Sequence, residues 1–193
     1  MDNTREKWLH RALPVMMAWL KDAGCKDFPV PHLSFGVPKK GWGNGKKMSI
    51  AECWPRAVTQ KQDRNVIHIS PRTGEPVAVL GSLLHELVHA SDDCESKHRG
   101  HFKHVALALG FTPPMTCTPL GPQLKIALEK LASDLGPLDH DPMVNFRSLK
   151  RKRSRVKYTC ATCGDSVNGK KVWHAMHMTE DGDECGEYEP EEE

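Results

Sequence analysis

The sequence predicts an α+β protein, with helices packed on a small sheet and a small metal-binding module near the C-terminal end. Apolar residues recur at steps of three and four over 4–23, 76–91 and 123–135, which is typical of amphipathic helices. Shorter stretches at 33–37, 48–54 and 65–70 have the composition of strands. At 193 residues, the chain can bury one sizeable core and still carry a small appendage.

The helices and strands predicted on either side of 76–91 follow from the local pattern of apolar residues. The first predicted helix has one apolar side, made of Trp8, Ala12, Val15, Met16, Trp19 and Leu20. In the strand predicted at 65–70, Ile67 and Ile69 share one face, because side chains alternate along a strand. The last predicted helix buries its leucines and ends at Gly136-Pro137.

The central stretch of the chain is Leu84-His85-Glu86-Leu87-Val88-His89-Ala90, within the helix predicted at 76–91. Pro76 suits the first turn of that helix, where its missing N–H is not needed. The His-Glu-x-x-His spacing puts two imidazoles one turn apart on the same face, where both can bind one zinc ion. Glu86 then stands beside the water that the metal activates. This pattern is typical of zinc hydrolases and predicts Glu86 as the catalytic base.

A hydrolytic zinc ion needs a third protein ligand and an open position for water. The eight residues between His89 and His98 are polar and long enough to turn the chain back toward the helix. We therefore predict that His85, His89 and His98 bind the catalytic zinc. His101 and His104 add two imidazoles nearby and remain alternatives for the third position.

Two other ligand layouts fit less well. One places Gly-x-x-His directly after the second histidine, but Asp92 and Glu95 stand at those positions. The other takes a later glutamate, and Glu129 is predicted on the solvent-facing side of its helix. Cys94, between the second and third ligands, could sit close to the metal.

These residues resemble the SprT-like family of zinc metallopeptidases, which includes the Spartan proteases that act on DNA–protein crosslinks. The resemblance rests on His85 to Ala90 and on His98-x-Gly100-x-Phe102 opening a helix. Glu52-Cys53-Trp54 and Ile69-Ser70-Pro71 are similar to strand ends in a phage and bacterial branch that ends in a small zinc ribbon. The resemblance implies a zincin-like metallopeptidase core over most of the chain, metal at the three histidines and Glu86 as general base.

A place for the substrate can also be predicted. In zinc proteases of this general build, an extended peptide adds to a strand edge beside the metal, so that backbone hydrogen bonds hold it without selecting a side chain. We expect 65–70 to be that edge.

Three parts of the chain are predicted: a metallopeptidase domain over 1–146, a basic linker over 147–157 and a zinc-ribbon-like module with an acidic tail over 158–193. Cys160 and Cys163, followed by glycine, supply two thiolates for a structural zinc, and Cys185 supplies a third. The fourth ligand is open between His177, His174 and a carboxylate such as Glu187, and we select His177. A ribbon without metal is the alternative.

The net charge of +2 is too small to indicate a polyanionic partner, but the charges are unevenly distributed. Carboxylates dominate 180–193, and a basic block precedes the module, made of Lys150, Arg151, Lys152, Arg153, Arg155 and Lys157. Because lysines and arginines release counterions from phosphate, this block predicts a contact with DNA. A solvated linker is the alternative, and the acidic tail could compete with DNA for the block.

Neither a targeting segment nor a membrane partner is predicted, because the apolar run 12–20 contains Pro14 and is shorter than the roughly 20 residues that span a bilayer. Seven cysteines with one Cys-x-x-Cys pair favour a reducing compartment. We therefore expect a cytoplasmic protein, or one in the host cytoplasm if the chain is viral.

The sequence thus predicts a zinc-dependent endopeptidase that acts on DNA-associated proteins and carries one catalytic and one structural zinc ion. The alternative is a zinc-stabilised nucleic-acid-binding or adaptor protein without proteolytic turnover. Glu86 favours the enzyme, because a structural metal site does not need a base beside it. A peptidase that cleaves one dedicated regulatory protein without DNA is a third possibility.

Overall fold

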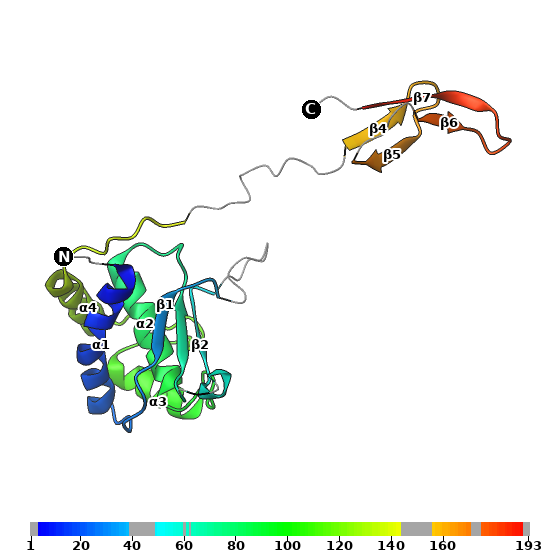
Figure 1. The fold of residues 1–193 in the computed structure, drawn as a ribbon. Coiled ribbons are helices and arrows are strands. Elements are labelled where there is room, and N and C mark those ends of the chain that lie inside the picture. The colour runs from blue at the N-terminus through cyan, green and yellow to red at the C-terminus, as the bar shows by residue number, and fades with distance from the viewer. Residues whose placement is uncertain are drawn as a thin grey trace. The chain divides into compact units, whose positions relative to one another are not determined.

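The computed structural model describes residues 4–38, 49–59, 61, 63–143, 156–170 and 175–190. The chain forms two compact units, Met1–Val144 and Asn145–Glu193. The described residues contain four α-helices and two small sheets, so the predicted α+β class is confirmed (Figure 1). Among them, no helix combines the length and apolar character needed to cross a membrane. The predicted domain boundary at 146 lies outside the described residues.

The larger unit contains a three-stranded sheet in the order β1-β3-β2. Its strands are β1 (His32–Phe35), β2 (Ala51–Trp54) and β3 (Val66–Ile69). Strand β3 runs parallel to β1 and antiparallel to β2, and its Ile67 and Ile69 are fully buried as predicted. The prediction that 65–70 is an open edge is therefore wrong. Both sides of this strand are hydrogen-bonded to neighbours, because strand order is set by pairing between distant segments.

Helix α2 (Pro76–Ala90) is the centre of the larger unit and packs against β2, β3 and the other three helices. It begins after Glu75, whose carboxylate accepts the N–H groups of Val77 and Ala78 at 3.0 and 2.6 Å. Its fully buried side chains are Val79, Leu80, Leu83, Leu84, Leu87 and Val88. Each contributes about 1.5–3 kcal/mol of burial free energy. The helix that carries the histidine motif is thus rigidly held on almost every side.

Helices α1 (Arg5–Asp22) and α4 (Pro122–Leu135) pack against each other and against α2. The indole N–H of Trp8 donates to the Gly136 carbonyl at 2.9 Å, and the Arg11 guanidinium donates to the Leu135 carbonyl at 2.8 Å. These two bonds satisfy carbonyl groups that the C-terminal end of α4 leaves without helical partners. They fix α1 to the end of α4.

Helix α3 (Gly100–Leu109) follows α2 after a loop, 91–99. It ends at Gly110, whose φ of 96° is the left-handed conformation that glycine adopts without strain. Phe102, Val105 and Ala106 are buried and pack it into the core. The loop 91–99 therefore connects two anchored helices.

The smaller unit is a four-stranded antiparallel sheet in the order β5-β4-β7-β6. Its strands are β4 (Val156–Cys160), β5 (Ser166–Gly169), β6 (Met176–Met178) and β7 (Glu184–Pro190). Cys160 is its one buried hydrophobic residue among those described. Since a sheet of this size cannot bury an apolar core, another source of stability is required.

Candidate metal centres

Three histidine rings converge at the C-terminal end of α2. The Nε2 atom of His98 lies 3.2 Å from Nε2 of His89 and 3.3 Å from Nε2 of His85. A tetrahedral ion with metal–nitrogen bonds of about 2.0–2.1 Å requires nitrogen–nitrogen spacings of about 3.3 Å. The structure therefore brings the three predicted ligands together at the spacing that a metal ion needs, and this group could hold one.

The electrostatics of this histidine cluster favour a metal over protons. Burial, together with the neighbouring imidazoles, lowers the pKa of His85 to about 3. Burial and the charge of His98 lower the pKa of His89 to about 4, and burial lowers the pKa of His98. Rings that stay neutral at pH 7 can each offer a nitrogen lone pair, and a cation between the three Nε2 atoms would be stabilised by them.

Two contacts orient the rings. The Nδ1 atom of His85 lies 2.7 Å from the hydroxyl of Thr118, which is 7% exposed. An Nδ1–H that donates to this hydroxyl leaves Nε2 as the lone-pair nitrogen. The ring of Phe102 packs against all three imidazoles, with centroid distances from 4.3 to 5.0 Å.

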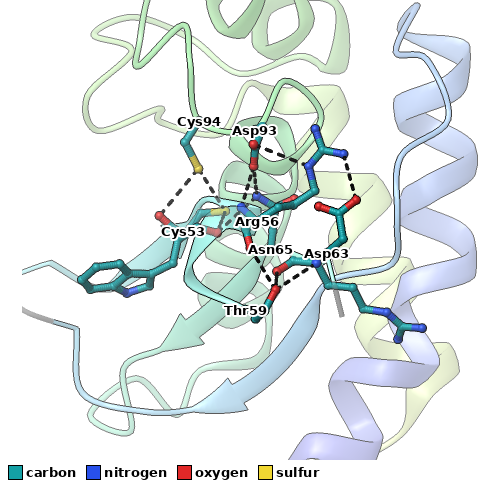
Figure 2. Close-up of polar contacts among 9 residues, drawn as sticks. Cys53, Arg56, Thr59, Asp63, Asn65, Asp93 and Cys94 are labelled. Atoms are coloured by element: carbon teal, nitrogen blue, oxygen red, sulfur yellow. Dashed lines mark hydrogen bonds and ion pairs between the residues drawn. The ribbon is translucent and has the colours of Figure 1, made fainter. Parts of the chain in front are cut away.

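The loop 91–99 carries His98 and is fixed by a polar network (Figure 2). Asp93 accepts the backbone N–H of Arg56 at 2.8 Å and the side-chain amide of Asn65 at 2.9 Å. The Arg56 guanidinium also lies 3.5 Å from the Asp93 carboxylate. Asp93, Cys94 and Lys97 have positive φ angles of 55°, 67° and 53°, so the loop has a conformation that needs such support.

Glu86 lies beside the cluster and is 6% exposed. Burial and the nearby charge of Glu52 raise its pKa to about 8, while a hydrogen bond from the Cys53 backbone N–H acts in the opposite direction. A cation held by the three histidines would also favour the carboxylate. The structure thus places a buried carboxyl group with a raised pKa next to His85 in the chain and in contact with strand β2.

The other predicted candidates lie away from the histidine cluster. His101 contacts the Ser91 hydroxyl at 3.0 Å, and His104 is exposed. Glu129 is also exposed and lies 3.8 Å from Lys125 on its own helix. The thiol of Cys94 contacts Cys53 and is not part of this cluster.

A second group that could hold a metal ion lies in the smaller unit and consists of Cys160, Cys163, His177 and Cys185. The sulfurs of Cys160 and Cys185 are 4.0 Å apart, and Cys163 Sγ lies 3.1 Å from Nδ1 of His177. Tetrahedral sites with metal–sulfur bonds of about 2.3 Å have sulfur–sulfur spacings of about 3.8 Å. The backbone N–H of Cys163 lowers the pKa of Cys160 to about 6 and so favours the thiolate that a metal binds. Of the predicted alternatives for the fourth ligand, His174 lies outside the described residues and Glu187 is not in the group.

Two features support this second group. The Asp165 carboxylate lies 3.5 Å from Nε2 of His177 and accepts the Tyr188 hydroxyl at 3.0 Å, so it can orient the ring with Nδ1 toward the sulfurs. A Cβ atom added to Gly186 would clash with Thr162 and lie 3.2 Å from the sulfur of Cys160. Only glycine therefore fits at this position of strand β7, next to Cys185.

Most of the residues predicted to contact nucleic acid lie outside the part of the chain that the structure describes. Lys157 is exposed on β4. The other members of the basic block lie outside the described residues: Lys150, Arg151, Lys152, Arg153 and Arg155. The DNA contact stays a prediction.

Sequence patterns missed the residues that support both clusters. Thr118 is 33 positions from His85, and Asn65 is 28 positions from Asp93. Asp165, directly after the Cys-x-x-Cys-Gly turn, is the one whose position offered a local signal, because carboxylates commonly orient a metal-binding histidine.

Comparison with known proteins adds no assignment. No protein-family model matches the chain, and no curated protein or solved structure matches it.

Proposed function

We propose that this protein is a zinc-dependent endopeptidase of the SprT-like type, with a zincin-like core. The observation that carries the proposal is the convergence of the His85, His89 and His98 nitrogens beside the buried carboxyl group of Glu86. A structural metal site has no need of an acid–base group at its side. A zinc ion bound there supplies Lewis acidity, which polarises the scissile carbonyl and lowers the pKa of the attacking water.

The residues of the chain have separate roles in this reaction. Glu86 accepts a proton from the attacking water and then gives it to the leaving amine, so that the peptide bond breaks into a carboxylate and an amine. A pKa raised toward neutrality suits this two-way transfer, because the group can both accept and release a proton near pH 7. The Thr118 hydroxyl holds the His85 ring in its binding orientation.

Strand β2 is the edge where we place the substrate. It pairs with β3 on one side, and no other described strand pairs with its second side. The Ser70 N–H donates to the Ile50 carbonyl at 2.7 Å, and pairing alternates along an antiparallel ladder, so the backbone of Cys53 points away from β3. Its N–H bonds to Glu86 and its carbonyl oxygen lies 3.7 Å from the Cys94 sulfur, so an added peptide would pair with β2 on the Ala51 side of these contacts. An extended peptide added there would lie beside the metal ligands.

DNA-associated proteins are the proposed substrate class. The support is the basic block near the start of the smaller unit and the group in the same unit that could hold a metal, which together provide a phosphate-binding stretch and a folded module. DNA binding would raise the local concentration of protein substrates held on the same strand.

The experiment compares the purified wild-type protein with Glu86→Gln, with and without single-stranded DNA. Cleavage of a DNA-bound protein and self-cleavage are followed on gels, and zinc content is measured in parallel. Glutamine keeps the shape of the side chain and cannot accept the proton, so zinc content should be unchanged and turnover should fall by about 10²–10⁴-fold.

The outcomes separate the candidate functions. Cleavage only with DNA supports proteolysis of DNA-associated proteins, and cleavage independent of DNA supports a dedicated protein substrate. If both proteins carry zinc at the histidine cluster and neither cleaves under any condition, the proposal fails and a non-catalytic binding protein becomes the better explanation.

A further inference from the structure

Two thiols outside both metal-binding groups lie in direct contact. The sulfur of Cys94 is 3.5 Å from the sulfur of Cys53 and 3.7 Å from the Cys53 carbonyl oxygen (Figure 2). The two residues are 41 positions apart, one on strand β2 and one in the loop 91–99. Both residues are half-buried. The contact therefore joins strand β2 to the loop that carries His98.

The backbone on both sides of this contact is anchored. Cys53 is held in the ladder opposite Ile67. Cys94 follows Asp93, whose carboxylate binds the Arg56 N–H just after β2 and the Asn65 amide just before β3. The Cys94 N–H also donates to the His89 carbonyl at 2.8 Å. The left-handed backbone at Cys94, with φ of 67°, turns its side chain toward β2.

The other two cysteines of the larger unit lack such a contact between half-buried thiols. Cys25 is buried, and Cys117 is exposed and has no second cysteine beside it among the described residues. A disulfide requires two sulfurs that can approach to about 2.05 Å, and the contact needs only a small further movement. The two sulfurs are already in contact on anchored backbone, so an oxidant would find them close to the separation that a disulfide needs.

We propose that Cys53 and Cys94 are a reversible disulfide site that ties strand β2 to the loop 91–99. The oxidant is a low-molecular-weight disulfide such as oxidised glutathione. One cysteine thiolate attacks this disulfide and releases a first glutathione thiolate, which gives a mixed disulfide. The second cysteine thiolate attacks the protein sulfur of that mixed disulfide and releases the other glutathione. Two cysteine thiols are oxidised, one glutathione disulfide is reduced to two thiols, and the two cysteine protons balance the two thiolates released.

The disulfide would restrict the movement of two segments next to the histidine cluster. The loop 91–99 carries His98, and the Cys53 backbone contacts Glu86, so the crosslink would fix the third histidine relative to strand β2. Formation of the disulfide depends on the thiol contact alone and does not require that the protein is a peptidase.

The test uses the full-length, zinc-loaded protein incubated with oxidised glutathione under native conditions. Free thiols are then alkylated, and the digest is analysed by mass spectrometry without reduction. We expect a crosslinked peptide pair joining Cys53 to Cys94 that dithiothreitol removes, while Cys117 carries glutathione as a mixed disulfide. Because the bond closes a long loop, oxidation should also raise the Tm of the larger unit by at least about 5 °C.

Matched serine variants provide the controls. Cys53→Ser and Cys94→Ser should each lose the crosslink and the rise in Tm, whereas Cys117→Ser should keep both. The proposal is overturned if Cys117 takes up glutathione and no Cys53–Cys94 peptide forms. It is equally overturned if that peptide forms only after the protein has been unfolded in urea, because the native contact would then have no part in it.

Discussion

The hydroxyl of Thr118 lies 2.7 Å from Nδ1 of His85, although the two residues are 33 positions apart in the chain. Thr118 is nearly buried, and its φ of 39° is unusual for a β-branched residue. Structure around the site must support this conformation. The contact links the segment before α4 to the first histidine of the cluster and indicates that Thr118 positions this ring.

We therefore expect Thr118→Val to weaken metal binding at the histidine cluster by about 10–100-fold, because the hydroxyl that fixes His85 is lost while the branched shape is kept. Thr118→Ser retains the hydroxyl and should bind metal almost as the wild type does. Competition with a chromophoric chelator measures both affinities. Equal affinities of the valine and serine variants would contradict a positioning role.

The third ligand can be tested by comparing His98→Ala with His101→Ala. Only His98 brings its Nε2 atom into the cluster, whereas His101 contacts Ser91. His98→Ala should therefore weaken metal binding by more than about 100-fold, and His101→Ala should leave it unchanged. Zinc content after dialysis against a weak chelator provides the measurement, with the cysteine group of the smaller unit as an internal reference. Loss of metal from the His101 variant alone would reassign the ligand.

Asp93 should make the stability of the larger unit depend on pH. Burial disfavours its charge, but hydrogen bonds from the Arg56 N–H and the Asn65 amide, together with the Arg56 charge, outweigh burial and hold its pKa below 3.8. A depressed pKa contributes stability above pH 3.8 that is lost as pH falls through the folded-state value. Asp93→Asn should thus cost about 1–2 kcal/mol at neutral pH, and this difference should shrink below pH 3.8.

Urea unfolding at a series of pH values measures this difference. Asp63→Asn is the matched control, since Asp63 also lies near Arg56, at 3.9 Å, but its side chain is 81% exposed. An exposed ion pair contributes little, so this variant should unfold like the wild type. A destabilisation that is the same at every pH would argue against the proposed role of the Asp93 charge.

The cysteine group of the smaller unit should lose its metal in His177→Ala and bind it about 10–100-fold more weakly in Asp165→Asn, because this carboxylate orients the ligand ring. Cys117→Ser, in the larger unit, should leave the metal content unchanged. Zinc titration with each purified variant gives the result. If His177→Ala retains full affinity, another residue is the fourth ligand.

Removal of metal should affect the two units differently. The larger unit has an extensive apolar core around α2, whereas the described residues of the smaller unit bury little besides Cys160. A chelator should therefore unfold the smaller unit and leave the helices of the larger unit intact. Amide hydrogen exchange, read separately for the two units, should show loss of protection in 156–190 alone.

Local patterns in the sequence were sufficient for much of the fold. The helices at 4–23, 76–91 and 123–135 and the strand residues Ile67 and Ile69 follow from periodic burial, which each segment carries in its own residues. The spacing of His85 and His89 likewise places both rings on one helix face before any tertiary contact is known.

Strand order was not predictable in this way. The segment 65–70 has an apolar pattern that would suit either an edge or a middle strand, and its place between β1 and β2 depends on pairing with segments far along the chain. Among the described strands, the edges of this sheet are consequently β1 and β2.

By itself, the sequence determined the helices, the histidine pair with Glu86 between them, and the Cys-x-x-Cys turn, because these depend on spacing within one segment. The tertiary structure decided that His98, and neither His101 nor His104, completes the histidine cluster. It also decided that Thr118 supports His85 and that Cys94 meets Cys53. Such contacts join segments that only the packing of α2 against the sheet and its neighbouring helices brings within bonding distance.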